Sequence, residues 1–398
     1  PAITSADALP SGVRAAAFVY GFADGIDSYF NGLGRLEYLA RPLNRSITIS
    51  DLVEHEPDLL LLQKILNSGP EKFGDSLIIA DLYQKIRVHE ERFVSALLWA
   101  FSDRFSAGVM VPIINRQYRA EFSTVVKNNA KKIKELVGDL PQLSEGLKEL
   151  DEADLSKKAF VENIFHAHGF KEPNSFTNKG LGDIELESRY QYYKGKRFQA
   201  QARLGIRLPT NDHDVKIENI LDRPLGLENL GIKVGLYQDF NIWKHYVIWH
   251  SAFRGAFYLP TDVKRAIPRT EKQILPDIND PYQVEKIEKT YGMDLGVDTG
   301  ISLNFFKSTL SLSASYVWDY HAADSYKGKR DLYYDYLSDG TGYQSHALEL
   351  GVDLSSFQLF LDDQFPLPIR LSFAWHQPFS GEQALYTPYG RFDAVMLF

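Results

Sequence analysis

The chain has 398 residues, a length that suits two or three average domains or one large barrel. Its net charge of -8 speaks against a nucleic-acid partner, and the absence of cysteine excludes disulfides and thiolate metal sites. No segment approaches the roughly 18 consecutive apolar residues that a spanning helix needs, so a helical inner-membrane protein is excluded. A transmembrane β-barrel is not excluded, because its lipid-facing and lumen-facing residues alternate and average to ordinary hydropathy.

Strict alternation of polar and apolar residues predicts about twelve antiparallel β-strands. The clearest example is 197–209, where Phe198, Leu204, Ile206 and Leu208 share one face and charged or amide side chains occupy the other. In chain order the predicted strands cover 13–24, 88–101, 105–119, 182–193, 197–209, 228–240, 244–260, 290–304, 308–321, 345–358, 366–377 and 390–398.

The connections between these strands alternate in length. Short polar turns join the members of each pair, and longer segments join one pair to the next. This alternation is typical of a barrel with tight periplasmic turns and long extracellular loops. If the first strand runs outward, both termini lie in the periplasm.

Two of the long connections carry helical patterns. The first predicted insertion covers 51–82, where Asp51 and Glu54 could form a capping box for a helix over 51–67. The second covers 120–170, where apolar residues recur at helical spacing over 121–166 with a break at Pro141. We therefore expect residues 1–398 to form one barrel with two amphipathic helical insertions. The apolar faces of these insertions would pack inside the lumen, against a neighbouring subunit or on the membrane surface.

The strands of a soluble β-sandwich show the same alternation of polar and apolar residues. Alternation alone therefore does not tell whether the apolar face packs in a protein core or faces lipid. The apolar faces carry large aromatics near the predicted strand ends, as membrane-interface girdles do. The polar faces are small, charged and rich in glycine, which suits a curved wall facing water. The chain also begins at Pro1 without a Met or a charged leader, which suggests either that a signal peptide has been removed or that the sequence was trimmed. These features favour an outer-membrane barrel, which must close because no strand edge is tolerated in lipid.

This interpretation assigns side chains to lipid and to the lumen. The predicted lipid-facing residues are Phe198, Leu204, Ile206, Leu208, Trp249, Leu310, Leu312, Trp318, Phe373, Trp375 and Phe398. The predicted lumen-lining residues are Arg197, Arg203, Arg207, Lys233, Arg254, Glu185, Glu187, Asp294, Asp298, Asp319, Glu349 and Asp353.

The lumen charges fall into sectors of opposite sign, which leaves two interpretations open. Facing rows of opposite charge would set up a transverse field that selects polar solutes. Alternatively, neighbouring strands pair these charges and close a small twelve-strand lumen.

Metal binding and catalysis are weaker interpretations of the histidines. His166 and His168 lie two residues apart, a spacing that shares a face only on a strand, and the loop over 211–214 lacks the pattern of a calcium site. A hydrolase would need a serine–histidine pair. The candidates are His250 beside Ser251, on opposite faces, and His346 with His376, which could both face inward near Ser345 or Ser372. We predict no metal, no cofactor and no catalytic residue.

Three stretches resemble porin-like outer-membrane proteins: "WAFSDRFSAGVMVP" (99–112), "GLGDIEL" (180–186) and "GIRLPTND" (205–212). The whole is similar to the major outer-membrane protein family of Bdellovibrio-type predators. That resemblance implies a homo-oligomer larger than a trimer, a β-wall shared between subunits and a chamber that encloses membrane lipid. The terminal "RFDAVMLF" resembles the signal, ending at Phe398, that the barrel assembly machinery reads.

Together these observations predict a porin-like protein of a Gram-negative outer membrane. It would act as a passive diffusion channel, as an oligomeric β-wall enclosing lipid, or as both. Two alternatives remain: a non-conducting, lipid-organising oligomer and an outer-membrane hydrolase.

Overall fold

The computed structural model describes residues 6, 8–40, 45–48, 63, 64, 67, 78–125, 165, 166, 168–171, 174–211, 213, 215–244, 246–271, 273, 275–306 and 308–398. Within these ranges the chain is mainly extended, and no helix there has both the length and the apolar character to cross a membrane.

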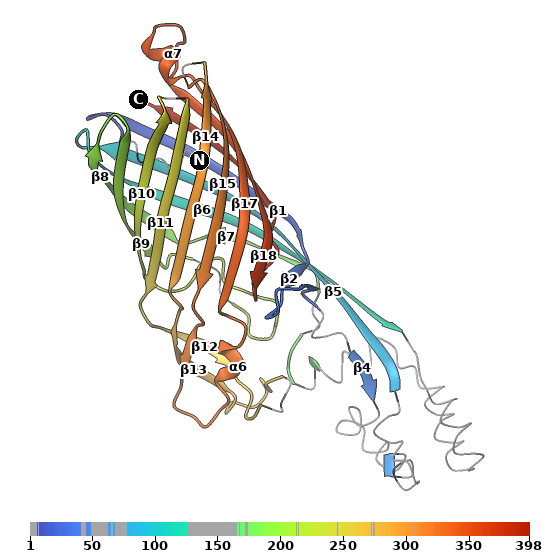
Figure 1. Cartoon of the computed structure of the whole chain (residues 1–398). Coiled ribbons are helices and arrows are strands. Elements are labelled where there is room, and N and C mark those ends of the chain that lie inside the picture. The colour runs from blue at the N-terminus through green and yellow to red at the C-terminus, as the bar shows by residue number, and fades with distance from the viewer. Residues whose placement is uncertain are drawn as a thin grey trace.

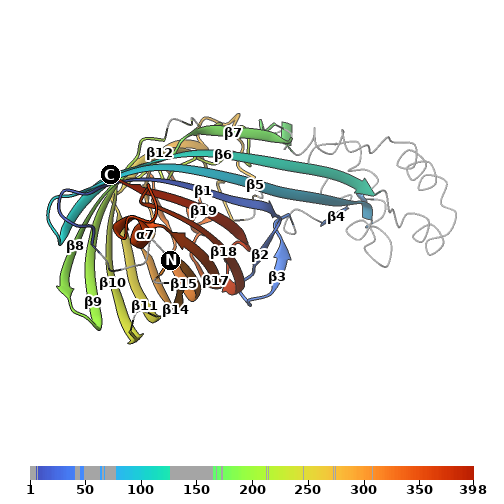
Figure 2. The same cartoon turned by 90° about the horizontal axis from the view of Figure 1, so that it is seen from above.

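Twelve antiparallel strands of the described chain form a closed barrel (Figures 1 and 2). They are β1 (Arg14–Ile26), β5 (Ile78–Ala100), β6 (Phe105–Val125), β8 (Ile184–Lys194), β9 (Phe198–Leu208), β10 (Gly231–Trp243), β11 (Val247–Tyr258), β14 (Asp294–Phe305), β15 (Leu310–His321), β17 (Tyr343–Ser355), β18 (Ile369–Glu382) and β19 (Tyr389–Leu397). The ring closes because β1 pairs with both β19 and β5, and β6 pairs with both β5 and β8. The predicted fold class is thus confirmed, with each predicted strand matching one barrel strand.

The barrel has two unlike ends. At the short-turn end, three or four residues join β5 to β6, β8 to β9, β10 to β11 and β14 to β15, and both β1 and β19 reach this end. The β17–β18 connection there is longer and holds the helix α7 (Phe357–Leu361). At the opposite, long-loop end, long connections join the remaining strands. The alternation predicted from the sequence is therefore present, with α7 as an addition to it.

The largest departure from the predicted strands is the hairpin of β5 and β6. Its register continues from Ala100↔Ser106 to Asp81↔Val125, well past the ring of the barrel. Residues 78–82 and 120–125, expected to belong to the helical insertions, are therefore strand. Cross-strand hydrogen bonding outweighs the local helical spacing in these residues. Most of both insertions lies outside the described residues, although residues 63, 64 and 67 are helical.

Two shorter strands flank the extended hairpin. β4 (Arg45–Thr48) pairs with β5, and β7 (Phe176–Leu181) pairs with β6 beyond the point where β8 leaves it. In Figure 2 this sheet projects sideways from the ring of the barrel. A second small hairpin, β2 (Ser28–Phe30) with β3 (Leu36–Tyr38), lies beside the end of β18.

A small cap stands at the long-loop end (Figure 1). It consists of the sheet β12 (Thr261–Ala266), β13 (Val284–Thr290) and β16 (Ser325–Lys327) with the helix α6 (Asp335–Ser338). Its core is apolar and nearly inaccessible to water, and it comprises Val263, Ile267, Ile287 and Leu332. Because this core is separate from the barrel wall, the cap packs as a unit of its own on the long loops.

Candidate functional site in the barrel lumen

The strand register separates an exposed apolar outer face from a polar inner face. On β9, Leu204 is 53% exposed and Ile206 42%, while Arg203, directly before Leu204, is 6% exposed and faces inward. The ten predicted lipid-facing residues that lie in strands share this outer face: Phe198, Leu204, Ile206, Leu208, Trp249, Leu310, Leu312, Trp318, Phe373 and Trp375. Phe398 follows β19 and is also exposed.

Eleven of the twelve predicted lumen charges lie on inner faces of the strands: Arg203, Arg207, Lys233, Arg254, Glu185, Glu187, Asp294, Asp298, Asp319, Glu349 and Asp353. The twelfth, Arg197, lies in the exposed turn before β9, where its carbonyl accepts a hydrogen bond from the Asn241 amide. The structure therefore does not bring Arg197 to the other eleven.

On β8, β9 and β10 the inward charges pair with one another, both between strands and within β8. Glu185 accepts from Arg207 at 2.7 Å and from Lys233 at 2.6 Å, and Glu187 accepts from Arg189 at 2.6 Å. The Glu185 carboxylate thus serves as the counter-ion of two cations, one on β9 and one on β10.

A second group of ion pairs lies farther around the inner face of the ring, on β11 to β18. Arg254 of β11 contacts Asp298 at 2.7 Å and Asp319 at 3.0 Å. A Cβ on the intervening Gly296 would stand 2.9 Å from the Arg254 guanidinium and 3.0 Å from the Asp319 carboxylate, so glycine leaves room for this bridge. Asp353 pairs with Arg370 at 3.0 Å.

These contacts favour the second interpretation of the charge sectors, in which adjacent strands pair their charges. The lumen is lined by local ion pairs, which lie within one strand or join strands one or two places apart. Such a wall is polar without a large excess of either sign. Some of its charged side chains keep partial exposure, such as Arg254 at 39% and Lys233 at 37%, and ion pairs exposed in this way are screened by solvent.

Four inward residues were not singled out from the sequence, namely Tyr237, Asp239, Arg391 and Asp393, and they contact residues that were. The Arg203 guanidinium lies 3.6 Å from the centre of the Tyr237 ring, and His250 Nδ1 lies 2.6 Å from Asp239 Oδ1. Arg391 bridges Glu349 and Asp393 at 3.8 and 3.2 Å. All of these residues have the inward parity of their strands, so the alternation itself could have identified them.

Two cavities follow the lumen. The vestibule at the long-loop end has a volume of about 790 Å³. It is lined by barrel residues such as Arg207 and His321, by the loop residue Arg223 and by Tyr336 of the cap helix α6. A smaller chamber of about 180 Å³ lies among Arg254, Asp319, Glu349 and other inward side chains. Both are large enough for several water molecules.

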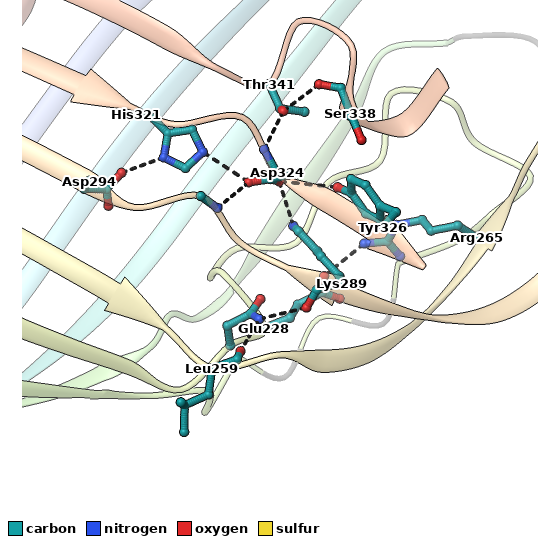
Figure 3. A network of polar contacts seen from close by, with 12 residues as sticks. Glu228, Leu259, Arg265, Lys289, Asp294, His321, Asp324, Tyr326, Ser338 and Thr341 are labelled. Atoms are coloured by element: carbon teal, nitrogen blue, oxygen red, sulfur yellow. Dashed lines mark hydrogen bonds and ion pairs between the residues drawn. The ribbon is translucent and has the colours of Figure 1, made fainter. Parts of the chain in front are cut away.

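A hydrogen-bond network joins the vestibule wall to the cap (Figure 3). His321, at the end of β15, lies 2.6 Å from Asp294 through Nδ1 and 3.1 Å from Asp324 through Nε2. The Gly292 amide also donates to Asp324, and Lys289 Nζ lies 3.6 Å from its second oxygen. Burial acts to raise the pKa of Asp324, but these donors and charges outweigh it and hold that pKa below its usual value. Asp324 is therefore an ionised anchor between barrel and cap.

The candidate hydrolase residues do not assemble into a catalytic group. His250 pairs with Asp239 in the lumen, whereas Ser251 lies on the opposite face of β11. The expectation that His346 faces inward is wrong, because it lies on the outer face of β17, 2.6 Å from the Tyr316 hydroxyl. It follows the register of Trp318, its cross-strand partner. Among the described residues, no three histidine or carboxylate groups are arranged to hold a metal ion.

Comparison with solved structures identifies the same fold in an outer membrane channel from Pseudomonas putida F1. The TM-score is 0.54 at 9% identity, and the match covers 99% of this chain and 98% of that one. The β domain of the Bordetella autotransporter BrkA matches with a TM-score of 0.35 at 8% identity over 98% and 99% of the two chains. The toluene transporter TodX of P. putida matches with 0.34 at 9% identity over 98% and 90%. Only the first score indicates a common fold. No protein-family model matches the chain, and no curated protein is detectably related to it in sequence.

Proposed function

We propose that the chain is a channel of a Gram-negative outer membrane that lets small polar solutes diffuse through its lumen. The carrying observation is the contrast between the two faces of one closed wall. The outside exposes apolar and aromatic side chains, and the inside holds ion pairs and two cavities. A bilayer outside and water inside would solvate both faces.

The ion pairs supply the chemistry of the passage. A solute moving along β8–β11 meets guanidinium, carboxylate and phenol groups on fixed strands, which exchange hydrogen bonds with a hydrated molecule. Since the charges are balanced locally, we expect weak selectivity for charge and stronger selectivity for size. No covalent step is needed, and we propose that the protein is not an enzyme.

Conductance in planar lipid bilayers tests this function. The purified protein should give discrete, stable current steps that scale with salt concentration. Current that never rises above the bare membrane, from protein whose gel mobility shifts on boiling as that of a folded barrel does, would contradict it.

An oligomeric, lipid-organising wall is a second candidate. The observation that favours it is the β5–β6 hairpin, which extends past the ring with β4 and β7 on its two edges. Such a sheet offers a neighbouring subunit a surface outside the barrel, as the resemblance to the Bdellovibrio-type family implies. The particle mass in detergent tests this: several chains per particle support it, and a monomer that conducts favours the simple channel.

We further propose that the barrel assembly machinery recognises the end of β19 at Phe398. Phe398 is 59% exposed, and its main chain pairs with Arg14 at the start of β1. Removing Phe398 should slow insertion into membranes without changing the conductance of the barrels that do form. An unchanged insertion rate would exclude this role.

A further inference from the structure

The segment that precedes β1 enters the barrel. At the short-turn rim, the Gly12 amide donates to the Ala100 carbonyl, and the Ser11 amide donates to Asp103 at 2.8 Å. Five residues earlier, Ala6 is completely buried against the inner faces of β8 and β10. The chain therefore passes from the rim beside β5 into the lumen.

Ala6 is held through its main chain. Its amide donates to Asp239 Oδ2 at 2.8 Å, and its carbonyl accepts from Gln191 Nε2 at 2.8 Å. Its methyl group packs against Tyr237 and Ala252. Buried backbone groups need partners, and here lumen side chains of two strands supply both of them. This is how a protein binds an extended peptide.

The groups that bind Ala6 are themselves fixed by neighbours. Asp239 Oδ1 lies 2.6 Å from His250 Nδ1, so each carboxylate oxygen has a defined partner. Gln191 Nε2 also donates to Gln199 at 3.0 Å. Tyr237, His250 and Ala252 line the 180 Å³ chamber as well, so the bound segment borders the narrower cavity of the lumen.

We propose that the inner wall around Gln191 and Asp239 is a peptide-binding site whose occupant is the main chain at Ala6, ahead of β1, and that the chain held there narrows the passage beside the chamber. The binding part of the proposal concerns the barrel alone. The narrowing part rests on the proposed channel function.

Thiol labelling tests the binding part, because the chain has no cysteine of its own. Ala6→Cys and, as a matched control in the same segment, Ser11→Cys are each treated with a bulky maleimide in the folded, detergent-solubilised protein. We expect Cys at position 6 to react far more slowly than at the exposed position 11. Adding Asp239→Asn to Ala6→Cys should speed the reaction about tenfold, the factor for one hydrogen bond to a charged group. Asp353→Asn, a lumen carboxylate that does not touch Ala6, should leave the rate unchanged. Equal rates at positions 6 and 11 would overturn the proposal.

Conductance tests the narrowing part. Removing residues 1–9 leaves the rim contacts of Ser11 and Gly12 in place, and it should raise the single-channel conductance at least twofold. Slow labelling at position 6 with unchanged conductance after the truncation would show that the segment binds without narrowing the channel. If neither the full chain nor the truncated one conducts, the channel function fails, while the labelling result still decides whether the segment is bound.

Discussion

The inner wall of the barrel has two arcs of different chemistry. The charged arc, on β8 to β19, carries the cross-strand ion pairs described above. The smooth arc, on β1, β5 and β6 toward the short-turn end, presents small or apolar residues to the lumen: Ala15, Ala17, Val19, Val94, Ala96, Leu98, Gly108, Met110 and Pro112. In the charged arc the two faces of a strand differ in composition, whereas in the smooth arc both faces are apolar. In the charged arc, sequence alternation therefore predicts which side chains face the lumen. In the smooth arc, only the strand pairing of the closed barrel shows it.

The largest expected effect is a charge on the outer face of the charged arc. Leu204→Arg places a cation where the bilayer would be, at a cost of about 2–4 kcal/mol near the midplane. We expect loss of the heat-modifiable folded band and failure to insert. Ser345→Arg, on the inner face of β17, should insert normally. Normal insertion of Leu204→Arg would mean that the faces are assigned the wrong way round.

The smooth arc offers a sharper version of the same test in two adjacent residues. Phe18 is 51% exposed on the outer face of β1, and Val19 faces the lumen. Phe18→Arg should reduce insertion strongly, while Val19→Arg should be tolerated because its side chain reaches water. Quantifying the protein in outer-membrane fractions measures both, and equal behaviour of the two variants would contradict the register of β1.

A third prediction concerns ion selectivity in the charged arc. Arg254→Gln removes the cation that Asp298 and Asp319 share. The two carboxylates then face the lumen without a partner, and we expect a severalfold rise in preference for cations, read from the reversal potential in a salt gradient. Arg14→Gln, at an exposed strand end, serves as the control of equal charge change. An unchanged reversal potential would place Arg254 outside the conducting path.

The smallest effect is expected at the junction of barrel and cap. The pKa of Asp324 is lowered from 3.8, so its ionised contacts stabilise the cap above that value and are lost as the pH falls through the lower, folded pKa. The protection factors of the amides over 321–343, which correct hydrogen exchange for its intrinsic pH dependence, should therefore fall at acid pH, by about tenfold for one charged hydrogen bond. Asp324→Asn should show the lower protection factors already at pH 7. If this variant keeps the native pH profile, another carboxylate carries the effect.

The sequence was sufficient for the barrel and for most of its lumen. Every one of the twelve strands was found, since alternation and turn lengths are local properties of the chain. Eleven of the twelve lumen charges lie where parity placed them, and Arg197 fails because it precedes its strand. His346 was misplaced although parity identifies its face: Glu349 and Asp353 of β17 point inward at odd positions, so the even-numbered His346 points outward.

Other features depend on contacts between distant residues and leave no local trace in the sequence. The extension of β5 and β6 requires the pairing of Asp81 with Val125, which helical spacing conceals. The burial of Ala6 requires Gln191 and Asp239, both far along the chain. The choice between a transverse field and local pairing likewise needed distances across strands.

The central claim is that the apolar outer face is solvated by acyl chains, and the five tryptophans report on it directly. Trp99, Trp249, Trp318 and Trp375 lie on outer faces, and Trp243 is 64% exposed at the end of β10. In vesicles of brominated phospholipid, whose bromines quench indole emission on contact, we predict that most of the tryptophan fluorescence is lost relative to ordinary vesicles. Emission that is the same in both kinds of vesicle would show that these side chains do not meet lipid, and the account would be wrong.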